Sequence, residues 1–242
     1  MSQPNRFQPH LNSPDEPTPF FRNARRVATA ITASLGPLTI RGAENLPPGP
    51  CILASNHRAH LDPPYLARIS NRQAAFMAKQ ELFEGFVGWF VRRMGAFPVR
   101  RGEPDRSALR TAIELLGRGY MVAIFPEGTR SPDGRLYPAE PGFGLIAKQS
   151  GAPIVPIAIE GTERAMPKGA KMLHRAAVTI TIGKPFTAAE ILEQHPGAKK
   201  DALDIIGRET MQRIHDLMIH PVPMADTPAP QDGGARATAH TT

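Results

Sequence analysis

Short apolar runs recur along the chain between turns rich in Gly and Pro. They are long enough for β-strands and lie at 38–41, 51–55, 74–79, 95–99, 120–125, 152–161 and 176–186. Several are separated by segments with apolar residues at helical spacing; residues 105–118, for example, place Leu109, Ala112 and Leu116 on one face. Strands that alternate with amphipathic helices predict an α/β fold with a central, mostly mixed β-sheet flanked by helices.

The kind of apolar pattern differs among the predicted strands. Residues 120–125 and 152–161 are almost continuously apolar, which is typical of central, buried strands. Residues 176–186 alternate apolar and polar positions, which favours an edge strand. A helix is predicted to begin at Asp62, an N-cap residue type that Pro63 follows at the first helical position. Further helices are predicted at 82–94, 105–118, 143–149, 188–195 and 199–220.

The two ends of the chain lack this periodicity. Residues 1–19 and 221–242 are rich in Pro, Ser, Thr and Ala and are predicted to be disordered tails. Between them, residues 20–37 are predicted to be an N-terminal helical segment, and 38–220 one α/β domain. The chain has 242 residues, 41% of them hydrophobic, which is enough for a single domain with a sizeable core.

The segment Phe20–Leu35 combines aromatic residues, three arginines and a set of Ala, Ile, Val and Leu. This composition suits a short helix at a membrane interface, and it equally suits a helix that packs on its own domain, so both interpretations stay open. No apolar stretch reaches the length of about 18 residues that predicts a transmembrane span. The first twenty residues lack the apolar core of a signal peptide.

The net charge is +7, and most of it falls in one region. Between Arg68 and Arg110, nine Lys and Arg stand against four Asp and Glu, so +5 of the +7 lies there. The excess indicates an anionic partner, either a phosphorylated substrate or an anionic membrane, although a solvated basic surface would explain the same charge. A nucleic-acid partner is disfavoured, because aromatic residues make up only 6% and no nucleic-acid-binding motif is present.

Polar residues gather directly after the predicted strand 51–55, in the sequence S-N-H-R-A-H-L-D (residues 55–62). His57, His60 and Asp62 offer part of a metal site, but no matching cluster of ligands follows downstream to complete it. Alternatively, Asp62 orients His57 as a general base at the carboxyl end of a strand, where open α/β sheets place their ligands. A third interpretation is an ordinary helix start with incidental histidines, and in it His60 is a polar loop residue.

The chain has one cysteine, Cys51, so no disulfide can form within it, which fits a reducing compartment. A catalytic Cys51–His57 pair is disfavoured, because Cys51 lies inside an apolar strand where a thiol is usually buried and unreactive.

Three more predicted strands end in polar or charged groups. G-A-F-P-V-R-R ends in Arg100 and Arg101, F-P-E-G-T-R-S closes the strand 120–125, and I-V-P-I-A-I-E-G-T ends in a polar turn. Each motif alone is a weak signal, because Pro, Glu and Gly form turns in any protein.

Taken in order, the four motifs resemble those of the 1-acyl-sn-glycerol-3-phosphate acyltransferase family, the lysophosphatidate acyltransferases of the PlsC type. Asn56, His57 and Asp62 match the first signature, N-H-x4-D. The resemblance covers residues 38–186 and implies an acyltransferase of phospholipid biosynthesis. The other matches are Gly95–Arg101 to the second signature, Phe125–Ser131 letter for letter to the third, F-P-E-G-T-R-S, and Val155–Ile157 with Gly161 and Thr162 to the fourth.

The resemblance implies transfer of a fatty acyl group from a thioester, acyl-CoA or acyl carrier protein, to the hydroxyl of a lysophospholipid. With 1-acyl-glycerol-3-phosphate as the acceptor, the product would be phosphatidate. His57 would be the general base, oriented by Asp62, and Arg101 would bind the acceptor's phosphate. No metal and no cofactor besides the thioester co-substrate are expected. The other candidate substrate-binding residues are Glu127, Gly128, Thr129 and Arg130, with Asn56 and Arg100 as further possibilities.

Two departures from the family pattern leave the acceptor's identity open. Arg100 stands where many relatives have Asp, and Glu140 where many have Lys. Another lysolipid or glycerol phosphate is therefore an alternative acceptor. A non-catalytic lipid-binding or membrane-binding protein of the same fold is a second alternative, although the intact His57–Asp62 pair argues against it. The expected location is peripheral, at the cytoplasmic face of an anionic membrane, and the oligomeric state stays open.

Overall fold

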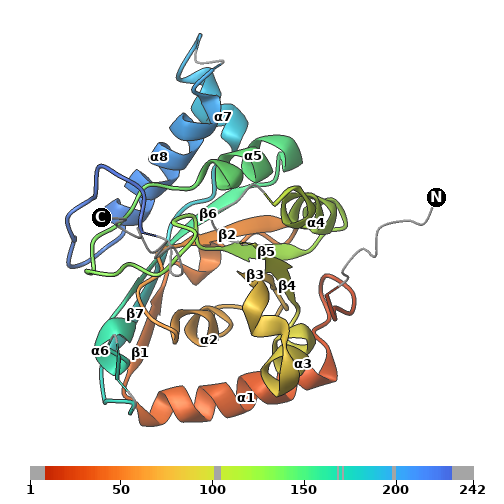
Figure 1. The fold of residues 1–242 in the computed structure, drawn as a ribbon, viewed down its shortest axis with the longest axis vertical. Coiled ribbons are helices and arrows are strands. Elements are labelled where there is room, and N and C mark those ends of the chain that lie inside the picture. Colours follow the sequence, from red (N-terminus) through yellow and green to blue (C-terminus); the bar gives the residue numbers. More distant parts are fainter. Residues whose placement is uncertain (1–8, 101–104, 168, 171, 198–199, 231–242) are drawn as a thin grey trace, which may run out of the picture.

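A single β-sheet forms the centre of the computed structural model, which describes residues 9–100, 105–167, 169–170, 172–197 and 200–230 (Figure 1). Within these residues the sheet has seven strands in the order β1-β7-β6-β2-β5-β3-β4. Neighbouring strands are parallel except for the antiparallel pair β6–β7, so the predicted α/β fold with a mixed sheet is confirmed. The strands are β1 (Leu38–Arg41), β2 (Cys51–Ser55), β3 (Ala75–Lys79), β4 (Ala96–Val99), β5 (Met121–Ile124), β6 (Ile154–Glu160) and β7 (Val178–Ile182).

The alternating strand β7 does not lie at the edge of the sheet. Its residue Ile180 pairs with Ile40 of β1 on one side and with Ile159 of β6 on the other. Ile180 is buried, whereas Thr179 and Thr181 on the opposite face are half-buried. The alternation of apolar and polar residues depends on how the two faces of a strand are covered, and it does not depend on whether both of its edges pair with other strands. The prediction of an edge strand was therefore wrong.

Helices cover both faces of the sheet (Figure 1). Helices α4, α5, α7 and α8 lie on one face and α1, α2 and α3 on the other. Successive residues of β2 point to opposite faces of the sheet. Ile52 packs in the cluster of buried side chains on one face, and Leu53 packs in the cluster on the other. The α-helices are α1 (Pro19–Ser34), α2 (Asp62–Leu66), α3 (Gly85–Arg93), α4 (Arg106–Gly117), α5 (Pro141–Ser150), α6 (Thr162–Ala165), α7 (Ala188–Glu193) and α8 (Ala202–Asp216), with short 3-10 turns at Ala43–Asn45 and Gln80–Phe83.

Helix α1 combines a buried and an exposed side. Thr18 caps its first turn by accepting a hydrogen bond from the backbone of Phe21, whose ring is fully buried. On the outer side, Val27 is 60% exposed and Ile31 is 49% exposed. No helix among the described residues is both long and apolar enough to cross a bilayer.

Chain on both sides of the domain also packs against it. Tyr120 donates its hydroxyl to the carbonyl of Asn12 at 2.5 Å, and Leu136 forms a β-bridge with Met224. The structure therefore differs from the predicted disordered tails over residues 9–18 and 221–230. These segments form hydrogen bonds with the folded domain that their composition does not reveal. The remainder of both tails lies outside the described residues.

Candidate active site

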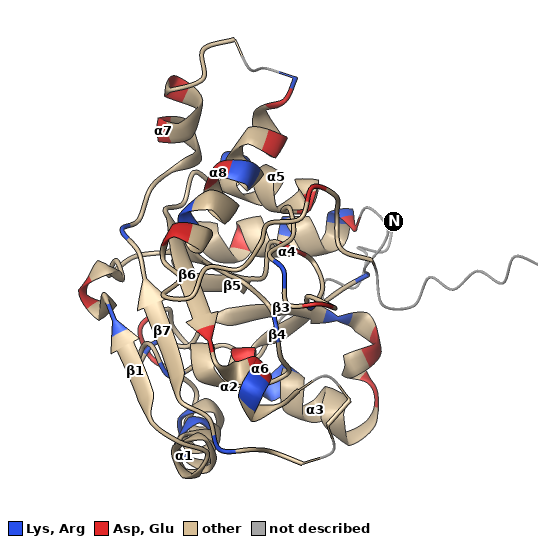
Figure 2. Cartoon of the chain, turned by 90° about the vertical axis from the view of Figure 1, so that its left-hand side faces the viewer, with Lys and Arg blue, Asp and Glu red and all other residues tan. Residues whose placement is uncertain are grey.

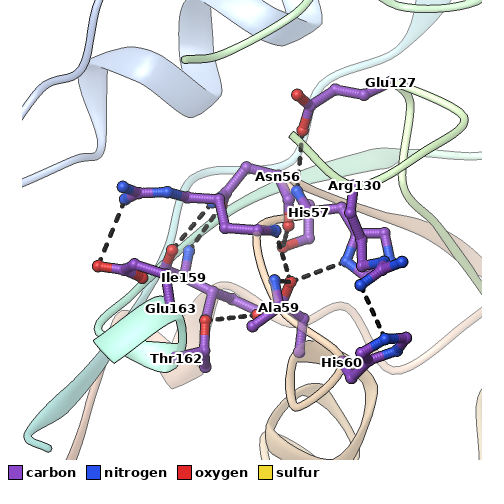
Figure 3. Close-up of polar contacts among 12 residues, drawn as sticks. Asn56, His57, Ala59, His60, Glu127, Arg130, Ile159, Thr162 and Glu163 are labelled. Atoms are coloured by element: carbon purple, nitrogen blue, oxygen red, sulfur yellow. Dashed lines mark hydrogen bonds and ion pairs between the residues drawn. The ribbon is translucent and has the colours of Figure 1, made fainter. Parts of the chain in front are cut away.

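His57 lies on the loop that follows strand β2 (Figure 3), and Asp62 is the first residue of α2, the helix to which this loop leads. Nδ1 of His57 lies 2.8 Å from Oδ2 of Asp62. The loop between them folds back on itself, and this brings together two residues whose five-residue spacing would place them apart on a helix. The structure thus supports the arrangement expected of a general base with an orienting carboxylate.

The carboxylate of Asp62 is buried and surrounded by donors. Besides the His57 ring, its Oδ2 accepts the backbone N–H groups of Arg58 at 2.7 Å and Ala59 at 2.8 Å. Its Oδ1 accepts the hydroxyl of Thr162 at 2.5 Å. Asp62 was predicted to be the N-cap of the following helix, but this was wrong by one position, because Leu61 is the N-cap. The side chain of Asp62 turns back to the preceding loop and holds its backbone.

The His57 ring is packed and only slightly accessible, with 6% of the residue exposed. It stacks on the ring of Phe125 with a centroid distance of 4.0 Å and an interplanar angle of 16°. Because Asp62 faces Nδ1, we assign the ring proton to Nδ1 in the neutral state. The other nitrogen, Nε2, then has a lone pair with which it can accept a proton from a substrate.

Asn56 joins two strand ends. Its side-chain nitrogen donates to the carbonyl of Ile159 at 2.9 Å, and its side-chain oxygen accepts the N–H of Ile159 at 2.8 Å. This contact ties the loop after β2 to the carboxyl end of β6. Both polar ends of the Asn56 amide are thereby engaged with the backbone, and the suggestion that Asn56 binds substrate stays a prediction.

Glu127 supports the loop that carries His57 from the adjacent strand end. One carboxylate oxygen accepts the backbone N–H of His57 at 2.8 Å, and the other accepts that of Tyr137 at 3.0 Å. The residue is 1% exposed, and this burial raises the pKa of Glu127 to about 8, against the lowering effect of the two backbone donors. In the structure its side chain faces the loop backbone, so its expected contact with the acceptor stays a prediction.

The sequence model of the Acyltransferase family matches residues 37–160. This match covers half of the chain and includes His57, Asp62 and Glu127. The chain belongs to this acyltransferase family.

The relatives that resemble the chain are 1-acyl-sn-glycerol-3-phosphate acyltransferases. A chloroplast enzyme of Brassica napus is 39% identical over 153 residues, which are 61% of this chain and 44% of the relative. The enzyme of Bacillus subtilis is 31% identical over 201 residues, which are 82% of this chain and 95% of the relative. The crystal structure of PlsC, the 1-acyl-sn-glycerophosphate acyltransferase of Thermotoga maritima, matches with a TM-score of 0.65 and 26% identity over 83% of this chain and 81% of that one. The chain spans about half the length of the chloroplast relatives it matches.

The third family motif continues from Glu127 around the site. Gly128 has a φ of +70°, and a Cβ atom there would lie 2.8 Å from the side chain of Glu140, so a larger residue would be both strained and crowded. Thr129 is fully buried, and its hydroxyl has no hydrogen-bond partner among the described residues. Arg130 contacts Nε2 of His60 at 2.7 Å, which makes His60 a neighbour of the site although it is outside the family pattern (Figure 3).

An apolar pocket of about 600 Å³ lies near His57 and Asp62. Phe125, which stacks on His57, forms part of its wall, and Gly128 lies beside it. Helix α5 contributes the largest part of the apolar lining, and single residues come from α4 (Leu109) and α8 (Leu203). The strands β3, β4 and β5 add Met77, Val99 and Ile124. Its charged lining residues are Arg100, Asp105 and Glu140.

The second family motif is only partly described by the structure. Arg100 donates its backbone N–H to Oδ2 of Asp105 at 2.9 Å, and its side-chain Nε lies 3.5 Å from the same oxygen. Asp105 in turn caps α4. Arg101, the predicted phosphate-binding residue, lies outside the described residues, so its role stays a prediction.

Two other predictions about this region concern thiol and metal chemistry. Cys51 is buried, and burial raises the pKa of its thiol to about 12, which agrees with the interpretation of an unreactive core cysteine. Across the part of the chain that the structure describes, no group of three or more His, Cys, Asp or Glu side chains could hold a metal ion.

Sequence reasoning missed the role of Thr162. The residue was part of the fourth matched motif, but no contact was assigned to it. Only the position of β6 next to β2 brings its hydroxyl to Asp62. The polar turn after an apolar strand was the one available signal.

Proposed function

We propose that the protein transfers a fatty acyl group from a thioester to the free hydroxyl of 1-acyl-glycerol-3-phosphate and so produces phosphatidate. The observation that carries this proposal is the buried contact of 2.8 Å between His57 and Asp62, in which the His57 ring stacks on Phe125, a residue in the wall of an apolar pocket. The same reaction is in the names of relatives that include one matched over 95% of its length. A non-catalytic binding protein would have no use for an oriented base.

The His57–Asp62 pair explains how an alcohol becomes reactive near neutral pH. As the acceptor's hydroxyl oxygen attacks the thioester carbonyl, Nε2 of His57 takes the hydroxyl proton. Asp62 holds the ring and stabilises its positive charge. When the tetrahedral intermediate collapses, the C–S bond breaks, and the leaving thiolate takes the proton back from His57. The ester is formed, the thiol is released, and no acyl group is attached to the enzyme.

The pocket beside Phe125 supports a lipid substrate. Its lining is mostly apolar, which suits an acyl chain, because burying each methylene group contributes roughly 0.8 kcal/mol. The second and third motifs supply arginines for the acceptor's phosphate, with Arg101 as the main candidate and Arg100 and Arg130 as neighbours. Acyl-CoA and acyl carrier protein are both possible donors, and neither requires a metal or another cofactor in this mechanism.

The proposed substrate resides in a bilayer, so we also propose that the protein binds peripherally to the cytoplasmic face of an anionic membrane. Four side chains of α3 are exposed although they are large and apolar: Phe86 by 78%, Val87 by 54%, Trp89 by 45% and Phe90 by 40%. The ring of Trp89 packs edge-to-face on Phe20 of α1 at 5.4 Å, so the two helices form one surface. Figure 2 shows basic positions on α1, at the lower end of the molecule. Aromatic rings beside arginines are typical of interfacial helices.

A direct assay tests the proposed reaction. Purified protein is incubated with 1-acyl-glycerol-3-phosphate and with acyl-CoA or acyl carrier protein, and the products are identified by mass spectrometry. Phosphatidate is expected from at least one donor and not from the His57→Ala variant. Parallel assays with other lysophospholipids and with glycerol phosphate test the alternative acceptors. These alternatives stay open because Arg100 and Glu140 depart from the family pattern. Acylation of one of these instead of 1-acyl-glycerol-3-phosphate would overturn the substrate assignment, and no acylation at all would overturn the proposed activity.

A further inference from the structure

Thr162 contacts Asp62 on the side away from His57. Its hydroxyl donates to Oδ1 of Asp62 at 2.5 Å, while His57 uses Oδ2 (Figure 3). Both Thr162 and Asp62 are buried, at 0% and 1% exposure. The hydroxyl of Thr162, at the start of α6, therefore holds Oδ1 of Asp62, the carboxylate oxygen that His57 does not contact.

We infer that Thr162 is a positioning residue of the reaction, which acts on His57 through Asp62. The kinetic part of this inference rests on the proposed function. The geometric part depends only on the three side chains and can be tested without a substrate.

The hydrogen bond fixes the plane of the carboxylate. A carboxylate rotates about the bond between its Cβ and Cγ atoms unless both oxygens are held, and here Oδ2 has three donors while Oδ1 has Thr162. A hydrogen bond to a buried charged group is short and strong. Without this donor, Oδ1 of Asp62 would lose the one partner that holds it among the described residues, and the orientation that directs Oδ2 at the imidazole would be less well defined.

The same bond also changes the charge that His57 faces. A donor to Oδ1 stabilises part of the negative charge of Asp62, which leaves less of it to stabilise a protonated imidazole. Removing the hydroxyl should therefore favour the protonated form of His57, which cannot act as a base. The acid limb of the pH–rate profile should then move to higher pH.

The backbone around Thr162 is arranged to place this hydroxyl. Gly161, just before it, has a φ of +99°, and a Cβ atom there would collide with the carbonyl of Ala177. Two residues earlier, Ile159 holds the amide of Asn56 at both its polar ends. The end of β6 thus holds the first residue of the segment 56–62, and the first residue of α6 holds its last.

The kinetic test compares Thr162→Val, which keeps the shape but removes the donor, with Thr162→Ser, which keeps the donor. Thr162→Val is expected to lower kcat by about 10- to 100-fold, the size of effect known for residues that orient the metal-binding side chains of other enzymes. The KM values of acceptor and donor should hardly change, and the acid limb should move to higher pH. Thr162→Ser should restore both kcat and the profile. Thr210→Val is the matched control, because Thr210 is equally buried but its hydroxyl donates within α8, to the carbonyl of Ile206.

A second measurement does not depend on turnover. The ring of His57 is followed by NMR in 15N-histidine-labelled, ligand-free protein as the pH is varied, and its signal is identified by its loss in His57→Ala. The midpoint of its titration should rise in Thr162→Val and stay near the parent value in Thr162→Ser and Thr210→Val. If Thr162→Val does not fold, Thr162→Cys gives the same comparison, because a thiol is a weak donor of similar size.

The outcomes separate this inference from the proposed function. A shifted His57 titration in a protein that makes no phosphatidate would retain the positioning role and reject the proposed reaction. Phosphatidate synthesis with an unchanged titration and pH profile in Thr162→Val would reject the positioning role alone. A serine variant no better than the valine variant would also reject it, because the hydroxyl would then not be what matters.

Discussion

The backbone N–H of His57 donates to Oε1 of Glu127 at 2.8 Å. The proposed base is therefore held by two acidic side chains, Asp62 at its ring and Glu127 at its main chain. The second of these lies on the loop after β5, so the ends of the adjacent strands β2 and β5 are linked through it. Because Glu127 is buried, this link should depend on pH.

Glu127 should make the protein less stable as the pH rises from about 4.5 to about 8. Burial raises its pKa to about 8 in the folded protein, from a reference value of 4.5. Between these values the folded protein keeps a proton that the unfolded chain has released, so the free energy of unfolding falls by up to about 1.4 kcal/mol per pH unit. Urea unfolding at pH 5, 6, 7 and 8 measures this fall.

The variant Glu127→Gln isolates the contribution of this carboxyl group. Its amide still accepts from one backbone N–H but turns its NH2 group toward the other, so some stability is lost at every pH. The stability advantage of the parent over the variant should be largest at pH 5 and shrink toward pH 8. An advantage that is constant over this range would show that Glu127 does not titrate there.

The strands and helices of this fold were predictable where the local pattern decides them. Continuous apolar runs identified β5 and β6, and helical spacing identified α4. The position of β7 was not predictable from its own residues, because strand order depends on where the flanking connections cross the sheet. Composition predicts a disordered tail over residues 1–19, but it does not reveal partners far along the chain, such as Tyr120 for Asn12.

The candidate site was predictable as a set of residue types and in its His57–Asp62 contact, but not in its long-range contacts. The motifs placed His57, Asp62 and Glu127 at strand ends, which is where open α/β sheets bind ligands. The long-range contacts join residues about 70 to 100 positions apart, such as Glu127 with His57 and Thr162 with Asp62. They follow from β6, β2 and β5 lying side by side, which no single motif specifies.

His57→Ala should lower kcat by roughly 100- to 10,000-fold, the usual contribution of a positioned general base. The fold should survive, because Asp62 keeps three of its donors: Arg58 N–H, Ala59 N–H and the Thr162 hydroxyl. Steady-state kinetics and a thermal melt check the two statements. His195→Ala is the control and should behave like the parent, because His195 lies just after α7 and its ring hydrogen-bonds to the backbone carbonyl of Ile191.

Asp62→Asn should reduce kcat less than His57→Ala does. The amide oxygen can take the place of Oδ2 and still accept from the imidazole, while the NH2 group faces the hydroxyl of Thr162, which can accept. Orientation of the ring is then kept, but the charged imidazolium loses its counter-ion. If Asp62→Asn lowered kcat as much as His57→Ala or more, the structure of the loop would depend on the negative charge of Asp62 and not only on the geometry of its hydrogen bonds.

Phe86→Asp should weaken binding to anionic vesicles without unfolding the protein. Phe86 is 78% exposed, so the change removes no core contact. Full burial of such a ring in a bilayer contributes about 1.5–3 kcal/mol, so the partition coefficient should fall by about 10-fold or more. Vesicle sedimentation measures it, and Ile219→Asp, at an exposed apolar residue just after α8, is the control. Equal effects of the two variants would place the membrane-binding surface elsewhere than α3.

Arg101→Ala should raise the KM of the acceptor and leave the KM of the donor nearly unchanged. A guanidinium supplies two parallel donors to a phosphate, and the loss of such a charge-assisted contact costs about 1.5–3 kcal/mol, or one to two powers of ten in kcat/KM. Arg101→Lys keeps the charge but not the paired donors and should fall between the parent and the alanine variant.

Arg100→Ala and Arg130→Ala test whether the phosphate contact belongs to Arg101. Arg100 is partly engaged by Asp105, and Arg130 contacts His60, so each already has a role at the edge of the site. Each should therefore affect the acceptor's KM less than Arg101→Ala does. If Arg130→Ala raised the acceptor's KM strongly and Arg101→Ala did not change it, the phosphate-binding residue would be Arg130 of the third motif. If none of the three arginines affected the acceptor's KM, the acceptor would not be a phosphate ester, and the assay with neutral and zwitterionic lysolipids would identify the substrate.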